Sequence, residues 1–173
     1  MGVTCTLQLS MVLSHLQIET LHKEVTEMAI QFQGGCLCGS VRYECTAEPV
    51  ISGHCQCTDC RKASGSGHSS HLAVPVNSVS ISGNVKVYDR KADSGNMVGR
   101  AFCPSCGSPV YSVNCGMPGL LFLRASSLDD LEMFKPQVVV FTKRAASWDY
   151  IDPKLPAFEA MPPSQAMPAA ISR

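Results

Sequence analysis

Three short clusters of cysteine carry the chemistry that this sequence suggests. They are Cys36 and Cys38, then Cys55, Cys57 and Cys60, then Cys103 and Cys106. Thiolates two or three residues apart on a tight turn can converge on one ion, and zinc takes such ligands tetrahedrally at roughly 2.3 Å. Seven ligands divide into a closed site of four and a set of three, which leaves one coordination position open. The sequence therefore predicts two Zn²⁺ ions, one that holds the fold and one that can do chemistry.

The two simple pairs, Cys36/Cys38 and Cys103/Cys106, are predicted to share the structural zinc. Glycines flank both pairs and allow the tight backbone turns that paired ligands need. One ion shared between them would close a long loop and couple metal binding to folding. The alternative is that these four are buried or free cysteines without a metal.

The remaining run, Cys55, Cys57 and Cys60, lies on one predicted loop and is expected to bind one face of the second ion. Arg61 and Lys62 follow at once. A nearby cation favours the thiolate over the thiol and attracts an anionic substrate. We therefore expect this loop to form an exposed, reactive zinc site.

A second closed zinc site is the alternative, and it would need a fourth ligand. His54 adjoins the cysteine run, and His68 and His71 follow it. The last two are expected to be surface or core residues more often than ligands. Cys45 alternates with apolar strand residues and is expected in the core, and Cys115 is expected to pack.

Composition limits the classes of protein to consider. The chain has 173 residues, 45% of them apolar and 16% charged, which is typical of one globular domain. Fourteen basic and fourteen acidic residues give zero net charge, which argues against binding along a nucleic-acid backbone. No apolar run reaches the ~18 residues of a membrane helix. The first thirty residues lack a secretory signal, so free cysteines in a reducing cytoplasm are favoured over disulfides.

Periodicity divides the chain into three parts. Residues 1–31 form a leader whose apolar spacing predicts a short N-terminal helix. Residues 32–160 form the zinc-binding domain, and the proline-rich residues 161–173 form an extended tail. Strands are expected around Val41–Cys45 and over 71–76, 79–82, 85–88, 98–103, 109–113, 120–124 and 137–142, with a helical turn over 127–133. Short strands at this spacing predict a mainly β domain of antiparallel sheets.

Several stretches together resemble one known family. They are Gly34 to Tyr43, His54 to Lys62 with Ser64, Gly65 and Ser66, Phe102 to Ser108, Trp148 to Tyr150, and Leu155, Pro156 and Phe158. In this order they resemble the glutathione-dependent formaldehyde-activating enzyme family, also called the centromere protein V family, over about residues 32–160. The resemblance implies a β-tent fold of antiparallel sheets around a zinc-ribbon-like site, with the same division of the cysteines. The leader, His68 and His71 depart from the family's usual pattern.

The family's named activity is condensation of glutathione with formaldehyde to S-(hydroxymethyl)glutathione, a carbon–sulfur lyase reaction. Many members have no established substrate and some are chromatin-associated, so the family implies the fold more strongly than the reaction. Our hypothesis is that a substrate thiol takes the open position of the second zinc, loses its proton and attacks a small aldehyde. Zinc acting as a Lewis acid on the aldehyde is less favoured, because three thiolates already donate much charge.

Arg61, Lys62 and His54 are the predicted substrate contacts, with a cation holding a glutathione carboxylate. Two other functional classes stay open at this point. A non-catalytic, zinc-stabilised interaction module would have two closed zinc sites, and a redox enzyme would need Cys115 or Cys45 exposed and reactive. The sequence is also compatible with a homo-oligomer.

Overall fold

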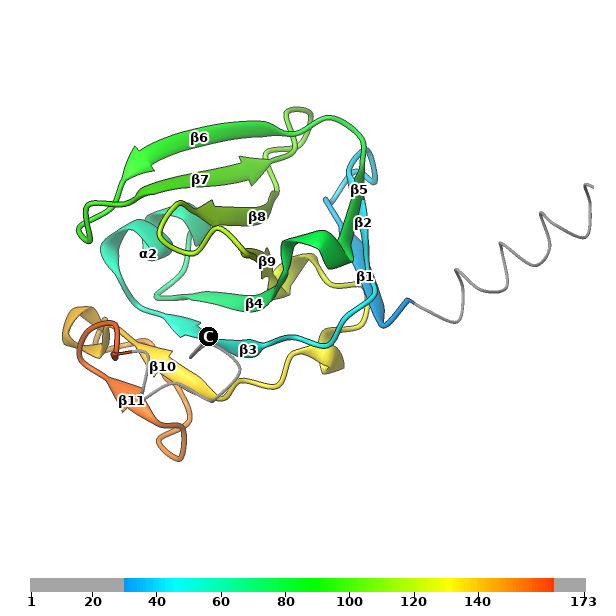
Figure 1. Ribbon diagram of the computed structural model, residues 1–173. Coiled ribbons are helices and arrows are strands. Elements are labelled where there is room, and N and C mark those ends of the chain that lie inside the picture. The colour runs from blue at the N-terminus through cyan, green and yellow to red at the C-terminus, as the bar shows by residue number, and fades with distance from the viewer. Residues whose placement is uncertain (1–29, 164–173) are drawn as a thin grey trace, which may run out of the picture. The chain divides into compact units, whose positions relative to one another are not determined.

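The computed structural model describes residues 30–163, and these are built mainly of short β-strands (Figure 1). The strands are β1 Phe32–Gly35, β2 Arg42–Cys45, β3 Ile51–Cys55, β4 Ser69–Pro75, β5 Val79–Ser82, β6 Lys86–Lys91, β7 Met97–Phe102, β8 Pro109–Asn114, β9 Leu120–Arg124, β10 Val138–Val140 and β11 Ala157–Phe158. Helix α2 is Thr58–Ser64, and the 3₁₀ turns are η1 Val76–Ser78, η2 Ala125–Ser127, η3 Leu131–Met133 and η4 Thr142–Arg144. The prediction of a mainly β fold is confirmed. The predicted N-terminal helix and the end of the tail lie outside the described residues.

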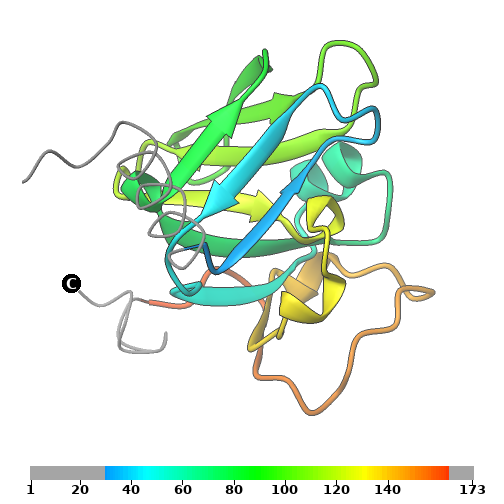
Figure 2. The same cartoon turned by 90° about the vertical axis from the view of Figure 1, so that its right-hand side faces the viewer.

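The strands form two sheets. The small sheet has the order β1-β2-β5, and the large sheet has the order β11-β10-β3-β4-β9-β8-β7-β6. Figure 2 shows the small sheet lying over one face of the large sheet. Neighbouring strands are antiparallel except at β10, which runs parallel to both β3 and β11. This mixed edge departs from the purely antiparallel expectation, because long connections, and not hairpins, bring β10 beside its neighbours.

The main hydrophobic core lies between the two sheets. Side chains of a strand point alternately to its two faces, and Leu72 and Val74 of β4 point to the same side as Leu121 and Leu123 of β9. All four are buried there with Val41, Tyr43, Cys45, Cys103 and Val110. The hydroxyl of Tyr43 forms a hydrogen bond of 3.0 Å with Ser127, which satisfies the one polar atom of this buried ring.

A second apolar cluster covers the opposite face of the large sheet. Its buried members are Ile51, Ala73, Val138 and Val140, and Cys55 packs against them. This face therefore carries residues 51, 53 and 55 of β3 and residues 69, 71 and 73 of β4. The same face of the sheet carries Cys55, Ser69 and His71 of the candidate site described below.

Several elements lie within one or two residues of their predicted positions, and β5 and β9 have the predicted bounds. The sequence did not predict β3 or α2. Strand β3 has the sequence Ile-Ser-Gly-His-Cys, which lacks clear alternation; pairing with β4 on one side and β10 on the other holds it extended. The predicted cysteine loop is instead a helix from Thr58, because Cys57 caps it with its sulfur. No helix among residues 30–163 is long and apolar enough to cross a bilayer.

Candidate metal centres and active site

Four cysteines from two distant loops meet in the first centre. Cys36 and Cys38 lie between β1 and β2, and Cys103 and Cys106 lie between β7 and β8. Their sulfurs all lie within 4.8 Å of one another. The Sγ of Cys38 is 3.5 Å from that of Cys36 and 3.7 Å from that of Cys103. A tetrahedron with 2.3 Å bonds has edges of about 3.8 Å, so this spacing fits four sulfurs on one zinc ion.

The two loops have backbone shapes that suit ligand turns. Gly39 has φ 77° and Gly107 has φ 74°, both in the left-handed region where glycine is favoured. The backbone N–H of Val41 donates to Cys36 Sγ at 3.2 Å, and such a bond stabilises a thiolate. Four sulfurs complete a tetrahedron, so this centre has the donor set of a closed, structural zinc site.

Three cysteines from one short stretch form the second centre. Cys55 ends β3, Cys57 caps α2 and Cys60 lies in its first turn. Their sulfurs lie within 4.8 Å of one another, and the N–H of Cys60 donates to Cys57 Sγ at 3.3 Å. Hydrogen bonds from Cys55 and Cys60 outweigh burial and lower the pKa of Cys57 to about 2, whereas its thiol neighbours raise the pKa of Cys55. Such sulfurs must share protons, and a bound cation would displace them.

No fourth ligand joins this second set within residues 30–163. No other His, Cys, Asp or Glu there places a ligand atom within 4.8 Å of all three sulfurs. His71 comes nearest to being a fourth ligand, because its Nε2 lies 3.8 Å from Cys60 Sγ. However, Nη1 of Arg124 lies 3.2 Å from the same nitrogen. Burial, and then the charge of Arg124, lower the pKa of His71 well below its usual value, so this imidazole is neutral and accepts from the guanidinium.

Strand register explains why these groups meet. Cys55 pairs with Ser69 across β3 and β4, and His71 pairs with Arg124 across β4 and β9. Because facing residues of adjacent strands share a face, all four side chains lie on one side of the sheet. Helix α2, which carries Cys60, lies over this end of the strands (Figure 1).

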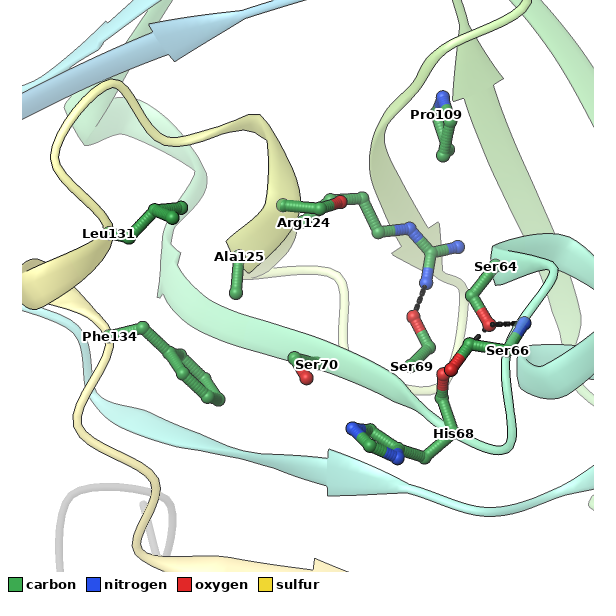
Figure 3. A pocket seen from close by; sticks show the side chains of 11 residues that line it. Ser64, Ser66, His68, Ser69, Ser70, Pro109, Arg124, Ala125, Leu131 and Phe134 are labelled. Carbon is green, nitrogen blue, oxygen red and sulfur yellow. Dashed lines mark hydrogen bonds between the residues drawn. The ribbon is translucent and has the colours of Figure 1, made fainter. Parts of the chain in front are cut away.

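A pocket of about 390 Å³ includes Ser69 and Arg124, which lie on the sheet face that carries Cys55 (Figure 3). Its lining comes from Ser64, Ser66, His68, Ser69, Ser70, Pro109, Arg124, Ala125, Ser126, Leu131 and Phe134. The volume suits a small-molecule ligand. The pocket and the cysteine set share neighbours: Ser69 faces Cys55 in the sheet, and Ser64 lies on the same helix as Cys60.

Arg124 is the cation of this pocket. It is only 2% exposed, and its Nη1 donates to Ser69 Oγ and lies beside His71. Its Nε has no hydrogen-bond partner among the described residues. A buried charge with an unused donor is costly unless an anion pairs with it, so this guanidinium suits an anionic group in the pocket.

The buried carboxylate of Asp149 contacts a second pocket residue, His68. Nδ1 of His68 lies 3.0 Å and 2.9 Å from the two carboxylate oxygens of Asp149. Gln56 Nε2 donates to the same carboxylate at 3.3 Å. The rings of His68 and His54 meet edge to face, with centroids 4.6 Å apart.

The structure places the three predicted substrate contacts on two elements, His54 on β3 and the other two on α2. His54 lies on the opposite face of β3 from Cys55: its Nδ1 is 2.9 Å from Ser70 Oγ. Burial, and then the charge of His68, lower the pKa of His54 to about 4. Arg61 and Lys62 lie on α2, and Lys62 is exposed. None of the three is among the residues that line the pocket in the described part of the chain.

Sequence reasoning did not assign a role to Arg124, Ser69 or Asp149. Arg124 carried a usable signal, because it is a single charge at the end of the apolar run Leu120–Leu123. Ser69 and Asp149 carried none beyond their polarity, since their roles depend on strand register and on a distant loop.

Comparison with known proteins agrees with the motifs. Residues 31–144 match the family model described as glutathione-dependent formaldehyde-activating enzyme. No curated protein matches the chain. Among solved structures the chain is similar to a Rhodobacter sphaeroides protein, a Northeast Structural Genomics target, with 20% identity and a TM-score of 0.46. That similarity covers 56% of this chain and 87% of the other.

Proposed function

This chain belongs to the glutathione-dependent formaldehyde-activating enzyme family, and from that premise we propose that it activates a small thiol for reversible addition to an aldehyde. The thiol is glutathione or a similar molecule, and the aldehyde is formaldehyde or another small one. One observation carries the proposal: three cysteine sulfurs lie within 4.8 Å of one another, with no fourth ligand in residues 30–163, and His71 connects them with the buried cation of a pocket, Arg124.

The donor sets fit two zinc ions. Thiolate ligands are soft and favour zinc over hard cations such as magnesium or calcium. Cys55, Cys57 and Cys60 would hold the reactive ion, and the four-cysteine centre would hold the structural one. A zinc ion held by three sulfurs supplies one open position at which the pKa of a thiol falls.

The addition itself is of the carbon–sulfur lyase type. The thiol loses its S–H proton and its sulfur bonds to the carbonyl carbon. The carbonyl π bond breaks, and the oxygen gains a proton to become the hydroxyl of the product. No electrons are gained or lost overall, so the reaction needs no redox cofactor. The residues of this chain would bind the thiol, orient it and screen it from water within the pocket.

Arg124 is our candidate for the group that binds the carboxylate of the thiol. A guanidinium pairs with a carboxylate through parallel hydrogen bonds, and Arg124 lines the pocket with one N–H unpaired among the described residues. His71 connects Arg124 with Cys60 by contacts of 3.2 Å and 3.8 Å. A carboxylate at Arg124 would therefore hold the rest of the molecule close to the three sulfurs. Arg61, Lys62 and His54 remain proposed as secondary contacts.

The setting of the protein is also a proposal. The nine cysteines of residues 30–163 are all free, which supports a reducing compartment such as the cytoplasm. The zero net charge supports small-molecule partners over nucleic acid.

The test is a measurement of exchange between free formaldehyde and its glutathione adduct. The two combine without a catalyst, so exchange NMR with ¹³C-formaldehyde must be read against a protein-free blank. We expect the zinc-loaded protein to accelerate exchange and Cys57→Ser to return it to the blank. If the zinc-loaded protein accelerates exchange with neither glutathione nor other small thiols, the non-catalytic interaction module is the correct function.

A further inference from the structure

We propose that the pocket binds the amino-acid end of the thiol, which has both an ammonium and a carboxylate group; in glutathione this is the γ-glutamyl end. Arg124 pairs with the carboxylate, His68 is the specificity-determining residue that accepts from the ammonium, and Asp149 is the positioning residue that holds His68. The inference rests on the proposed function for the identity of the ligand. His68 departs from the usual pattern of the family, so this selectivity would be a feature of this chain.

Two buried charges of opposite sign lie at or directly behind the pocket wall. Arg124 is 2% exposed, and the side chain of Asp149 is 8% exposed. The ion pairs within residues 30–163 include no acidic partner for Arg124, and neither a lysine nor an arginine for Asp149. A buried charge is costly without a countercharge. A ligand that carries both signs would offset both charges, whereas a ligand with one sign would offset only one.

The hydrogen bonds of His68 determine what it can offer to a ligand. Nδ1 lies 3.0 Å and 2.9 Å from the two oxygens of Asp149. An ionised carboxylate only accepts hydrogen bonds, so Nδ1 carries the hydrogen and Nε2 of the neutral imidazole has a free lone pair. No hydrogen bond occupies Nε2 within residues 30–163. An ammonium group only donates, and the hydroxyls of Ser66 and Ser70 in the pocket lining can accept its other hydrogens.

The position of Asp149 is fixed by its neighbours. Gln56 Nε2 donates to the carboxylate at 3.3 Å, and a Cβ at Gly67 would lie 2.6 Å from Oδ1. The adjoining imidazole of His54 provides no countercharge at neutral pH, because burial, and then the charge of His68, lower the pKa of His54 to about 4. The negative charge of Asp149 therefore acts on the pocket through His68.

The two ends of this site lie on opposite faces of the sheet. Arg124 lies on the face that carries Cys55, whereas the ring of His68 meets that of His54 on the other face. Both Arg124 and His68 line the pocket, and Figure 3 shows the ring of His68 extending toward Ser70. The ammonium is therefore held away from the cysteine sulfurs and selects the ligand without taking part in the reaction.

Binding of three analogues to the zinc-loaded protein tests the inference without any reaction. The probe is S-methylglutathione, which has no S–H group and cannot add to an aldehyde, and its Kd is measured by NMR titration. N-acetylation of the probe removes the ammonium and should weaken binding by about tenfold. Esterification of the glycine carboxylate leaves the γ-glutamyl end intact and should weaken binding by less than about threefold.

Protein variants test which side chain recognises the ammonium. His68→Leu should weaken binding of S-methylglutathione by about tenfold. It should leave the affinity for the N-acetylated analogue unchanged, which would also show that the pocket is intact. Asp149→Asn keeps a hydrogen-bond acceptor for Nδ1 but removes the charge, so we expect the same pattern with a smaller loss of about threefold. Asp152→Asn is the matched control, because this acid is exposed in the same loop and the variant should bind like the wild type.

The outcomes separate this inference from the proposed function. If the wild type binds the N-acetylated analogue as tightly as S-methylglutathione, the inference is overturned, while accelerated exchange would leave the proposed function standing. A larger loss from the glycine ester than from N-acetylation would place the glycine end in the pocket and overturn the inference as well. If His68→Leu weakens both analogues equally, the role of His68 is overturned. If the predicted affinities are found in a protein that never accelerates exchange, the amino-acid site stands and the proposed function fails.

Discussion

The two cysteine centres differ first in where their ligands come from. In the four-cysteine centre, Cys38 and Cys103 are 65 positions apart in sequence and their sulfurs are 3.7 Å apart. In the three-cysteine centre, all ligands lie between Cys55 and Cys60. A metal that joins distant segments closes a long loop and contributes to folding. A metal held by one short segment adds little to the fold, so we expect it to be free to serve chemistry.

The two centres differ also in what surrounds them. Backbone N–H groups and serine hydroxyls surround the first centre: the N–H of Val41 donates to Cys36 Sγ, and Cys106 Sγ donates to Ser108 Oγ at 3.3 Å. A neutral histidine contacts the second centre, and that histidine contacts a buried arginine that lines a pocket. The comparison suggests that the closed centre needs only stabilised thiolates, whereas the open one needs groups that recognise a ligand.

The largest expected effect comes from breaking the closed centre. Cys103→Ser removes a buried ligand of the four-cysteine set, and structural zinc contributes on the order of 10 kcal/mol to the folding of small zinc domains. We expect this variant to lose its cooperative thermal transition, measured by circular dichroism. Cys115→Ser, an exposed cysteine outside both sets, is the control and should unfold like the wild type.

The matching change in the open centre should leave the fold intact. Serine is a good N-cap residue, so Cys57→Ser keeps a cap for α2 while it removes a sulfur ligand. We expect a change in Tm of less than about 5 °C, together with the loss of one zinc and of the exchange activity. Equal destabilisation by Cys57→Ser and Cys103→Ser would show that the two centres have the same role.

Metal removal should empty the two centres one after the other, the three-cysteine centre first. Three protein ligands hold an ion less fully than four, so a chelator should first remove one zinc per chain. Activity should disappear in that step, while the far-ultraviolet spectrum persists until the second zinc leaves. If both ions and the far-ultraviolet spectrum were lost in one step, the two centres would not have different roles.

A smaller effect should appear in substrate affinity. Arg124→Lys keeps the charge but loses the planar pair of donors, so we expect KM for glutathione to rise about tenfold with a smaller change in kcat. Arg144→Lys is the matched control, because that arginine is paired with Asp93 on the surface. A KM that responds to Lys62→Met and not to Arg124→Lys would place the carboxylate on α2 instead.

The smallest effect concerns a surface ion pair near the closed centre. Arg42 donates to both oxygens of Asp129, and this bond lowers the pKa of Asp129. Because the folded pKa is lowered, the stabilisation is present above the unfolded value of about 4 and is lost as pH falls through the folded value. Both side chains are 41% exposed, so Asp129→Asn should cost only about 0.5 kcal/mol at pH 7. Denaturant titrations should show that this difference shrinks as the pH falls below about 4.

The sequence predicted the features that depend on local residue spacing. It did not predict those that depend on contacts between residues far apart in the chain. Cysteine spacing is local, and the structure has the same two groups of cysteines that the spacing suggests. The position of Arg124 depends on its register opposite His71, and that of Asp149 on a loop 81 positions beyond His68. Neither relation leaves a periodic signal in the chain.

Local signals also failed where the residue types were unusual for their positions. Helix α2 begins at Thr58 after a cysteine cap, and cysteine is not among the common N-cap residues. Strand β3 contains Gly53, which weakens the strand pattern but leaves room for the backbone of Val138 in the neighbouring strand. In both cases tertiary context, and not local propensity, decides the structure.

The most direct test of the two-centre account is a native mass spectrum of the intact protein, recorded with and without glutathione. For the wild type we predict two zinc ions and one glutathione adduct. For Cys57→Ser we predict one zinc ion and no adduct. An adduct that persists in Cys57→Ser, or a wild type that binds two zinc ions but neither glutathione nor any other small thiol, would contradict the claim that the three-cysteine centre is an open, thiol-binding site.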